Sequence, residues 1–273
     1  MREIGIRQGR LSPATGGRGH QFPWQSWKDE FVQARRCGFA SIEWLFAADD
    51  YQQNPIWMDS EHDEILRQSV DTGIRVRSLC ADYFVVHPLL RVSDQARRHN
   101  VAVLNRLVVA SARVGIEIVV VPALEAAEIR TAGERAELID ALSEPLALAA
   151  AHGVRLALET ELPGPEYRAL VERHHPTLGA CYDTGNAAAR GYDVAADVRA
   201  LAPYLCGIHI TDRKRNGPSV PLGQGDADFP AFFRVAAEVG YTGPLIVEAP
   251  VGEEPVSTAM AHLAFLKTRD FDK

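Results

Sequence analysis

The sequence predicts an α/β protein in which eight parallel strands, each followed by a helix, close into one barrel. Three observations support this prediction. Short apolar runs alternate with helix-like segments eight times along the 273 residues. That length is close to the ~250 residues of a typical eight-unit barrel. Several apolar runs end in a polar or charged side chain, which is typical of parallel barrel strands at their functional face.

The first four units consist of short apolar runs followed by helices that end at glycine, a residue that favours helix ends. Strands are expected at residues 4–6, 41–46, 75–81 and 116–121. Helices are expected at residues 27–36, 61–72, 94–114 and 131–151. A loop rich in glycine and proline, residues 11–25, separates the first strand from its helix. Because such long loops are uncommon in compact domains, we expect it to act as a lid.

The last four units follow the same pattern. Strands are expected at residues 156–159, 178–182, 205–208 and 245–247. Helices are expected at residues 165–174, 194–201, 230–239 and 255–267. A second long loop spans residues 211–229. Since no linker or break in composition divides the chain, residues 1–273 are expected to form a single (β/α)8, or TIM, barrel domain.

Composition narrows the class of protein. A net charge of −7 and a pI near 5.7 argue against a nucleic-acid-binding protein, which would carry a basic face, but still allow a small anionic ligand. The chain shows neither the apolar segment of a signal peptide nor a membrane span, so we expect a cytoplasmic protein without a membrane partner. Cys80, Cys181 and Cys206 lie in apolar runs and are expected to be buried free thiols.

Four apolar runs end in a side chain that can bind a metal ion, one in each of the last four units. These residues are Glu159, Asp183, His209 and Glu248. Because barrel strands present their C-terminal ends at one rim, we expect the four side chains to converge there. Each carboxylate alone could instead be a helix N-cap or an ion-pair partner, and the imidazole a core histidine. Their repetition in consecutive units favours a shared site.

Three carboxylates and one imidazole form a mostly oxygen-rich ligand set. It suits Mn²⁺ or Mg²⁺, and also Co²⁺, better than a structural zinc ion, and of these we expect Mn²⁺. Such a divalent metal ion polarises a substrate carbonyl and stabilises an ene-diolate. Glu159 and Glu248 are then the candidate catalytic acid/base pair. Two working bases would invert a stereocentre and one would move the carbonyl, and the sequence leaves both possibilities open.

Further polar side chains end the first three strands and would face the same rim. Gln8, Glu43 and Asp82 are therefore expected to contact substrate, although Glu43 could equally be an interior or capping carboxylate. All four tryptophans lie within the first 57 residues. They could form a platform for a sugar, or pack in a lid hinge or an oligomer contact.

Several motifs resemble those of a known family. They are LE at 158–159, YDTGN at 182–186, IHITDR at 208–213, LGQGDADF at 222–229, GYTGPLIVE at 240–248 and the opening GIRQGRLSP at 5–13. With them the chain resembles the sugar phosphate isomerase/epimerase family. This family belongs to the xylose-isomerase-like barrel superfamily, which includes ketose 3-epimerases, inosose dehydratases and endonuclease IV enzymes.

The resemblance implies a role for individual residues. It makes divalent-metal ligands of Glu159, Asp183, His209 and Glu248, with the two glutamates as acid and base. Ketose epimerases often carry a histidine three residues after the aspartate and an arginine six residues after the metal-binding histidine. Here those positions hold Asn186, which can bind a hydroxyl but cannot change charge, and Arg215. Arg213 is an equal candidate for substrate binding because it lies closer to the His-x-x-Asp stretch.

We therefore predict a divalent-metal-dependent isomerase or 3-epimerase of carbohydrate metabolism, acting on a sugar or sugar phosphate through an ene-diolate. A dehydratase of a keto-inositol-like cyclic ketose is an alternative, because it begins with the same proton abstraction. A barrel without catalytic activity that serves as a binding subunit is a second alternative. We expect no nucleic-acid partner, and a homo-oligomer is possible.

Overall fold

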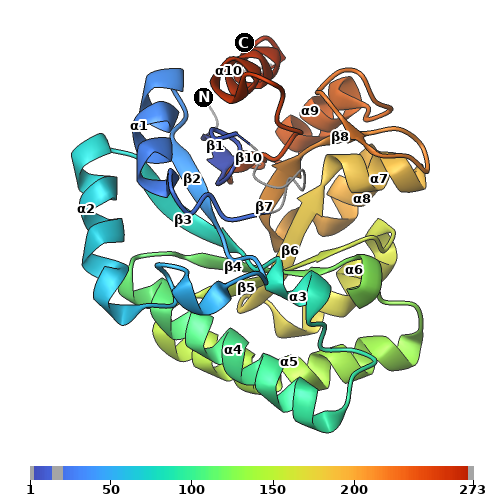
Figure 1. The fold of residues 1–273 in the computed structure, drawn as a ribbon. Coiled ribbons are helices and arrows are strands. Elements are labelled where there is room, and N and C mark those ends of the chain that lie inside the picture. The colour runs from blue at the N-terminus through green and yellow to red at the C-terminus, as the bar shows by residue number, and fades with distance from the viewer. Residues whose placement is uncertain (1–2, 14–20, 270–273) are drawn as a thin grey trace.

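Eight parallel strands close into a barrel in the computed structural model, which describes residues 3–13 and 21–269 (Figure 1). Around the barrel the strand order is β1-β10-β7-β6-β5-β4-β3-β2. The strands span Ile4–Arg7 (β1), Ser41–Leu45 (β2), Arg75–Cys80 (β3), Ile118–Ala123 (β4), Arg155–Thr160 (β5), Leu178–Asp183 (β6), Leu205–Ile210 (β7) and Leu245–Val247 (β10). The predicted fold class is confirmed. Residues 14–20 of the expected lid lie outside the described residues.

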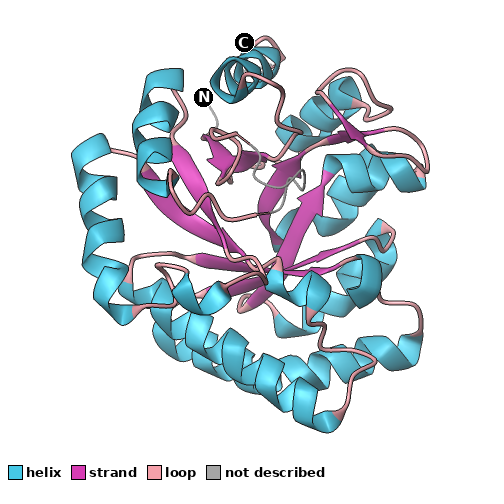
Figure 2. Cartoon of the chain, viewed as in Figure 1, coloured by secondary structure: helices cyan, strands magenta, loops and turns pink. Residues whose placement is uncertain are grey.

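Helices surround the strands on the outside of the barrel (Figure 2). They span Trp27–Cys37 (α1), His62–Thr72 (α2), Tyr83–Val86 (α3), Asp94–Arg113 (α4), Ala132–His152 (α5), Gly164–Val171 (α6), Thr184–Arg190 (α7), Val194–Leu201 (α8), Phe229–Glu238 (α9) and Pro255–Lys267 (α10). The short helices α3 and α7 were not predicted. The loop at 211–229 also contains an unpredicted antiparallel pair, β8 (Asp212–Arg213) and β9 (Ser219–Val220).

Local sequence explains where the helices begin and end. Thr131 and Glu134 form a reciprocal capping box at the start of α5, each side chain accepting a hydrogen bond from the backbone N–H of the other residue. Gly38 ends α1 in the left-handed conformation at φ 88°, which a residue with a Cβ rarely adopts. These signals set the boundaries between strands and helices.

Side chains alternate along each strand between the outer core and the barrel interior. The outer core, between strands and helices, takes Ile208 and Ile210 of β7. A separate small cluster of strand residues consists of Cys80, Val120, Ala157, Cys181 and Cys206. These interior side chains are small, and larger polar groups therefore fit above them at the rim.

The predicted free thiols are confirmed, because Cys80, Cys181 and Cys206 are buried and unbridged. Two of the four tryptophans are also buried in the structure. Trp44 is fully buried and donates its Nε1–H to Asn54 Oδ1 at 2.9 Å, and Trp27 packs edge-on against it. For these two residues the structure favours the packed role over the sugar platform.

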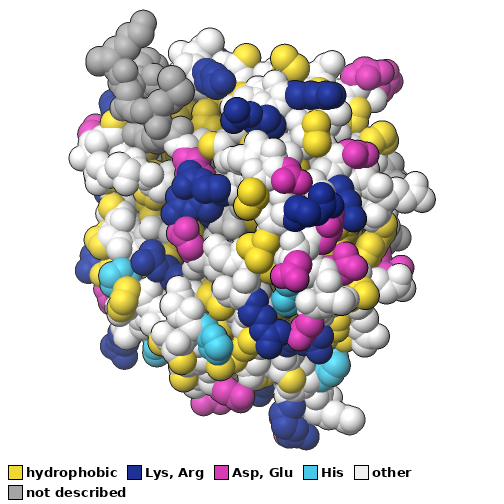
Figure 3. Space-filling model, turned by 90° about the vertical axis from the view of Figure 1, so that its left-hand side faces the viewer, with side chains coloured by type: hydrophobic (Ala, Val, Ile, Leu, Met, Phe, Trp, Pro, Cys, Tyr) yellow, Lys and Arg dark blue, Asp and Glu magenta, His cyan; other side chains and the backbone are white. Residues whose placement is uncertain are grey.

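Charged side chains of both signs are interspersed on the face shown in Figure 3. Among the ion pairs of the structure, Lys28 and Arg67 both pair with Glu64, and Arg113 pairs with Asp59. Because the two signs are mixed, the described part of this face has no large patch of positive or negative electrostatic potential. None of the described helices has the length and apolar character required to cross a lipid bilayer.

Candidate active site

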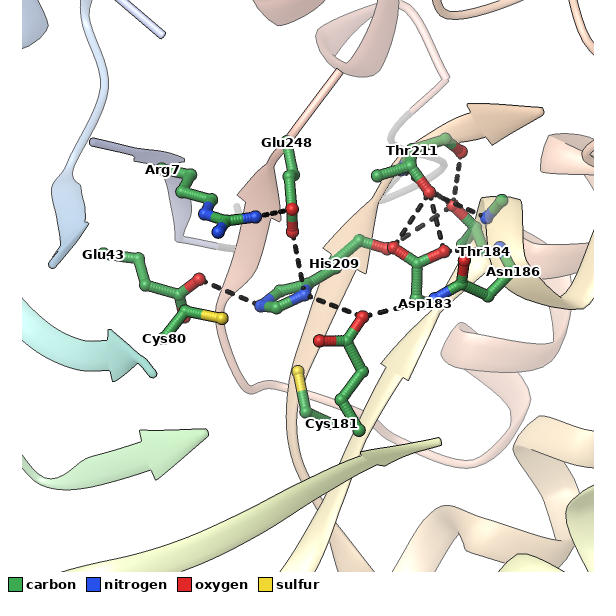
Figure 4. Close-up of polar contacts among 12 residues, drawn as sticks. Arg7, Glu43, Cys80, Cys181, Asp183, Thr184, Asn186, His209, Thr211 and Glu248 are labelled. Atoms are coloured by element: carbon green, nitrogen blue, oxygen red, sulfur yellow. Dashed lines mark hydrogen bonds and ion pairs between the residues drawn. The ribbon is translucent and has the colours of Figure 1, made fainter. Parts of the chain in front are cut away.

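The register of the strands brings the predicted polar residues to the same end of the barrel. Asp183 of β6 lies opposite His209 of β7, and Ile246 of β10 lies opposite the same histidine. On the far side of β10, Arg7 of β1 lies opposite Glu43 of β2. The C-terminal rim therefore contains acidic, basic and imidazole groups from strands that are distant in sequence (Figure 4).

His209 is at the centre of this rim and is fully buried. Its Nδ1 lies 3.4 Å from Glu159 Oε1 and 3.0 Å from Glu248 Oε2. Its Nε2, on the other side of the ring, lies 2.9 Å from Glu43 Oε1. One imidazole thus links carboxylates from β2, β5 and the residue that follows β10.

Asp183 completes a three-residue group with Glu159 and His209. Each of the three offers one ligand atom, and these atoms lie within 4.8 Å of one another. Asp183 is also the N-cap of α7, where its Oδ1 accepts a hydrogen bond from the backbone N–H of Asn186. Asp183 therefore caps a helix, as one alternative predicted, and also belongs to the three-residue group.

Thr211 fixes the orientation of the Asp183 carboxylate. Its Oγ1 lies 2.7 and 2.9 Å from the two carboxylate oxygens and accepts a hydrogen bond from the Gly185 N–H at 2.9 Å. A Cβ at position 185 would lie 2.3 Å from that hydroxyl oxygen, so only glycine fits there. Asp183 is consequently held by both Thr211 and the backbone N–H of Asn186.

Burial and crowding shift the proton affinities of these groups. Burial, and then the negative charge of Glu159, raise the pKa of Asp183 to about 6. Burial alone would lower the pKa of His209, but its acidic neighbours, among them the carboxylates of Glu43 and Glu159, outweigh burial and raise that pKa well above its usual value. The pKa of Cys181 is itself raised to about 12 by burial, so its thiol is neutral at physiological pH.

Glu248 pairs with Arg7, a residue that the sequence analysis did not single out. The Arg7 guanidinium contacts Glu248 Oε1 through Nη1 and Asp82 Oδ2 through Nη2. Burial alone would lower the pKa of Arg7, but Asp82 and other acidic groups raise it above its usual value, so this buried side chain is a permanent cation. The Oε2 atom of Glu248 remains directed at His209.

Glu30 of α1 holds the loop after β1 in place. This carboxylate is 1 % exposed and accepts hydrogen bonds from the N–H groups of Gly9 at 2.8 Å and Leu11 at 3.1 Å. Burial raises the pKa of Glu30 to about 7, despite these hydrogen bonds. Gln8, in the same loop, is buried, and its Oε1 accepts a hydrogen bond from the Leu45 N–H at 3.2 Å.

Asn186 and Arg213 form a polar chain that leads to Glu159. Arg213 Nη1 donates to Asn186 Oδ1 at 2.8 Å, and Asn186 Nδ2 donates to Glu159 Oε1 at 3.3 Å. Arg213 also lies 3.6 Å from Glu161, which pairs with Arg190. Arg213 thereby joins the site on the side of β6 and β7.

Arg215 lies in a different part of the structure from Arg213. Its side chain lines a cavity of about 700 Å³ between α7, α8 and α9, together with Thr184 and Asp226. Its backbone N–H donates to Asp226 Oδ2 at 2.7 Å. The structure therefore connects Arg213, and not Arg215, to the group around His209.

Asp212 shapes the loop between β7 and α9. Its carboxylate accepts hydrogen bonds from the N–H groups of Gly223, Gly225 and Ala227 at 2.8, 2.8 and 3.1 Å. A Cβ at position 225 would lie 2.0 Å from Asp212 Oδ1. The glycines of this motif thus allow the loop to wrap around an aspartate.

The residues around His209 Nδ1 fit a small, hard divalent cation. Adjacent ligand atoms around an octahedral ion with bonds of ~2.1 Å are about 3 Å apart, close to the distances from Nδ1 to Glu159 and Glu248. Neither ring nitrogen of His209 has an aligned hydrogen-bond partner, and neither has Glu248 Oε2, although all are buried. The group of three contains Glu159, Asp183 and His209, and Glu248 reaches it only through its contact with Nδ1.

Sequence reasoning missed two residues of the site, Arg7 and Thr211. Each directly follows or ends an apolar strand, at Ile6-Arg7 and Ile210-Thr211, so the rule that pointed to Asp183 and Glu248 could have identified both. Arginine and threonine were passed over because neither is a typical metal ligand.

The chain is similar in sequence and in fold to known proteins. The chain is 25% identical over 256 residues to L-ribulose-5-phosphate 3-epimerase UlaE of Escherichia coli (strain K12 / DH10B), with 90% of each chain covered. Its fold is similar to that of D-psicose 3-epimerase from Clostridium cellulolyticum H10, solved with D-tagatose (TM-score 0.76, 16% identity, 99% of both chains). It is also similar to the IolI protein, solved with a bound zinc atom (TM-score 0.79, 17% identity, 100% of both chains).

A match to a family model classifies the chain. The model described as xylose isomerase-like TIM barrel matches residues 31–269, which include Glu43 and the whole group around His209. This confirms the resemblance drawn from the sequence motifs. The chain belongs to the xylose isomerase-like TIM barrel family.

Proposed function

We propose that this protein is a divalent-metal-dependent 3-epimerase or isomerase of a sugar or sugar phosphate, with Mn²⁺ as the cation. The observation that carries the proposal is the position of two carboxylates beside one imidazole nitrogen. Glu159 and Glu248 approach His209 Nδ1 from β5 and from the end of β10, strands that are three places apart around the barrel. A substrate bound at this point is within reach of two bases from different directions.

The cation, when bound, polarises the substrate carbonyl and stabilises the negative charge of the ene-diolate. Glu159, Asp183 and His209 would hold it, and Glu248 would complete the set. One of the two glutamates removes the proton from the carbon next to the carbonyl, and the other returns a proton to the opposite face. With a single working base the carbonyl moves instead.

Other residues around the site support the proposal by providing groups that can bind and orient a polyhydroxylated substrate. Arg7 contacts one carboxylate oxygen of Glu248, and the other oxygen faces His209 Nδ1. Arg213 and Asn186 present hydrogen-bond donors beside Glu159, where they can orient substrate hydroxyls. The curated relative named as a ribulose-phosphate 3-epimerase supports the substrate class.

The proposal is tested with a panel of free and phosphorylated ketoses, incubated with the protein and Mn²⁺ in D₂O. We expect deuterium to enter one carbon next to the carbonyl, as followed by NMR, with the mass of the product otherwise unchanged. Loss of water from the product would indicate a dehydratase, and no exchange with any ketose would contradict the proposal.

A further inference from the structure

Glu43 is buried against the side of His209 that faces away from the other carboxylates. Figure 4 shows the Glu43 carboxylate facing the His209 ring. Its Oε1 lies 2.9 Å from Nε2, and only 1 % of its surface is exposed. On the opposite edge of the ring, Nδ1 faces Glu159 and Glu248. The two ring nitrogens therefore have separate environments, each with acidic oxygens nearby.

The position of Glu43 is itself fixed by the barrel. Ser78 of β3 donates its hydroxyl to Glu43 Oε2 at 2.7 Å, so the second carboxylate oxygen is occupied. A carboxylate held between the Ser78 hydroxyl and a ring nitrogen of His209 offers only acceptor oxygens. A buried acceptor held in this position favours the tautomer of His209 that carries its proton on Nε2.

We propose that Glu43 is a positioning residue that accepts the Nε2–H of His209 and thereby directs the Nδ1 lone pair towards the cation. The inference rests on the proposed function, because it assigns a role to a residue behind the same metal site. A neutral imidazole carries a proton on one nitrogen and a lone pair on the other. An acceptor beside Nε2 keeps the proton there, and Nδ1 is then free to bind the ion.

This assignment gives Glu43 a different role from the substrate contact that the sequence suggested. A side chain that contacts His209 and Ser78 and is almost fully buried has little surface left for a sugar. Glu43 Oε1 is within hydrogen-bond distance of Nε2 but is not in line with the ring N–H. Bonds of this kind tighten when an active site is filled.

Cys80 is the competing neighbour of Nε2, because its sulfur, Glu43 and His209 also form a three-residue group of possible metal ligands. Its thiol, however, donates to Asp82 Oδ1 at 3.3 Å. Glu43 places a carboxylate oxygen 2.9 Å from Nε2, and a carboxylate oxygen is a stronger hydrogen-bond acceptor than a thiol sulfur. A second cation bound by the Cys80 group is the rival explanation that the test has to separate.

The experiment measures Mn²⁺ binding by EPR for the wild type, Glu43→Met, Glu43→Gln and Ser78→Ala. Glu43→Met removes the acceptor at similar volume, and we expect Mn²⁺ affinity to fall ~10–100-fold, as for other groups that support a metal-bound histidine. Glu43→Gln keeps a carbonyl oxygen for Nε2–H and should recover part of the loss. Asp197→Asn is the matched control, because Asp197 is a buried carboxylate that binds the Gly164 N–H and Tyr182, away from His209.

A spectroscopic measurement tests the tautomer without relying on catalysis. In the Mg²⁺-loaded protein with ¹⁵N-labelled histidine, we expect a protonated, hydrogen-bonded Nε2 for His209, assigned from its absence in His209→Gln. This measurement on the wild type also covers the case in which Glu43→Met does not fold. A lone pair on Nε2 would overturn the proposal, as would wild-type Mn²⁺ affinity in Glu43→Met.

The remaining outcomes are equally decisive. Two binding equivalents of Mn²⁺, one of them lost in Cys80→Ser, would overturn the proposal in favour of the second cation. If the wild type binds no Mn²⁺, both this inference and the proposed function fail. If it binds Mn²⁺ in a Glu43-dependent manner but exchanges no sugar proton with D₂O, only the proposed function fails.

Discussion

Arg7 binds Glu248 at the seam where the first and last strands of the barrel pair with each other. The same guanidinium also binds Asp82 after β3. Both carboxylates have small exposed fractions, and Arg7 is 2 % exposed. A buried charge of this kind depends on its partners, since removal of one partner leaves the other without compensation.

Arg7→Met should therefore destabilise the protein strongly. We expect a loss of about 3–5 kcal/mol in the free energy of unfolding, which is typical for a broken buried ion pair, measured by urea denaturation. The double variant Arg7→Met/Glu248→Gln should lose less than Arg7→Met alone. Arg199→Met is the control, because its pair with Glu238 is about half exposed and should contribute less than about 1 kcal/mol. Equal losses in the two single variants would contradict the prediction.

Glu159→Gln and Glu248→Gln should each reduce the rate of deuterium incorporation from D₂O by about 10²–10⁴-fold, because an amide cannot exchange a proton as a general acid or base. Glu166→Gln is the control, since this glutamate of α6 pairs with Arg135 at the surface of the protein. Full activity in either of the first two variants would remove that residue from the mechanism.

Thr211→Val should weaken Mn²⁺ binding ~10-fold, because it removes the hydroxyl that orients Asp183 while keeping the shape of the side chain. Thr211→Ser retains the hydroxyl and should bind Mn²⁺ almost as the wild type does. The two affinities are compared by calorimetry. The prediction fails if valine and serine at this position have the same effect.

Glu30 should make stability decrease as pH rises. Its pKa of about 7 in the folded chain exceeds the ordinary value of 4.5, so between these values the folded state holds a proton that the unfolded state has lost. The contribution is complete below pH 4.5, declines as pH rises towards 7, and amounts to up to about 3 kcal/mol. Unfolding free energies at pH 5 and pH 8 should therefore differ less in Glu30→Gln than in the wild type.

The exposed carboxylate of Glu238 provides the comparison for this experiment. Glu238→Gln should keep the wild-type dependence on pH. Asp183, whose pKa is also raised, makes stability decrease with pH in every variant. The role of Glu30 is therefore read from the difference in pH dependence between the variants and the wild type. A pH dependence in Glu30→Gln that is unchanged from the wild type would show that this carboxyl does not titrate between those values.

Metal binding should weaken in acid because protons compete for Asp183. With a pKa near 6, this carboxyl is increasingly protonated below pH 6, and a protonated carboxyl is a poor ligand. We expect Mn²⁺ affinity to fall from pH 7 to pH 5, and removal of the ion with a chelator at pH 7 to lower Tm. In Asp183→Asn both the acid dependence and the effect of the chelator on Tm should be reduced, and their persistence would place the ion elsewhere.

Most of the barrel was predictable because its signals are local. Apolar runs and helix-ending glycines such as Gly38 can be recognised within a few neighbouring residues, and the length of the chain agrees with eight strand–helix units. The pair β8–β9 was missed because each strand is two residues long and is held by Asp212, whose hydrogen bonds reach up to 15 positions ahead. That contact cannot be seen in a window of sequence.

The candidate site was partly predictable for a similar reason. The rule that functional side chains follow barrel strands places Glu159, Asp183 and His209 in one group, as the structure does. It does not reveal which residues touch, so it leaves open whether Glu43 contacts substrate or is an interior carboxylate, and in the structure that carboxylate lies against His209. The roles of Arg7 and Glu30 depend on contacts across the barrel and beneath a loop, which no local pattern encodes.

The pairing of β1 with β10 has a consequence for biosynthesis. The ribosome releases Ile4–Arg7 long before it releases the partner strand Leu245–Val247 and the residue Glu248. Until then the edge strands of the growing sheet are unpaired, and the centre lacks one of the two carboxylates beside His209 Nδ1. A prematurely terminated product would therefore lack the complete site and would be prone to associate with other chains through its open edges.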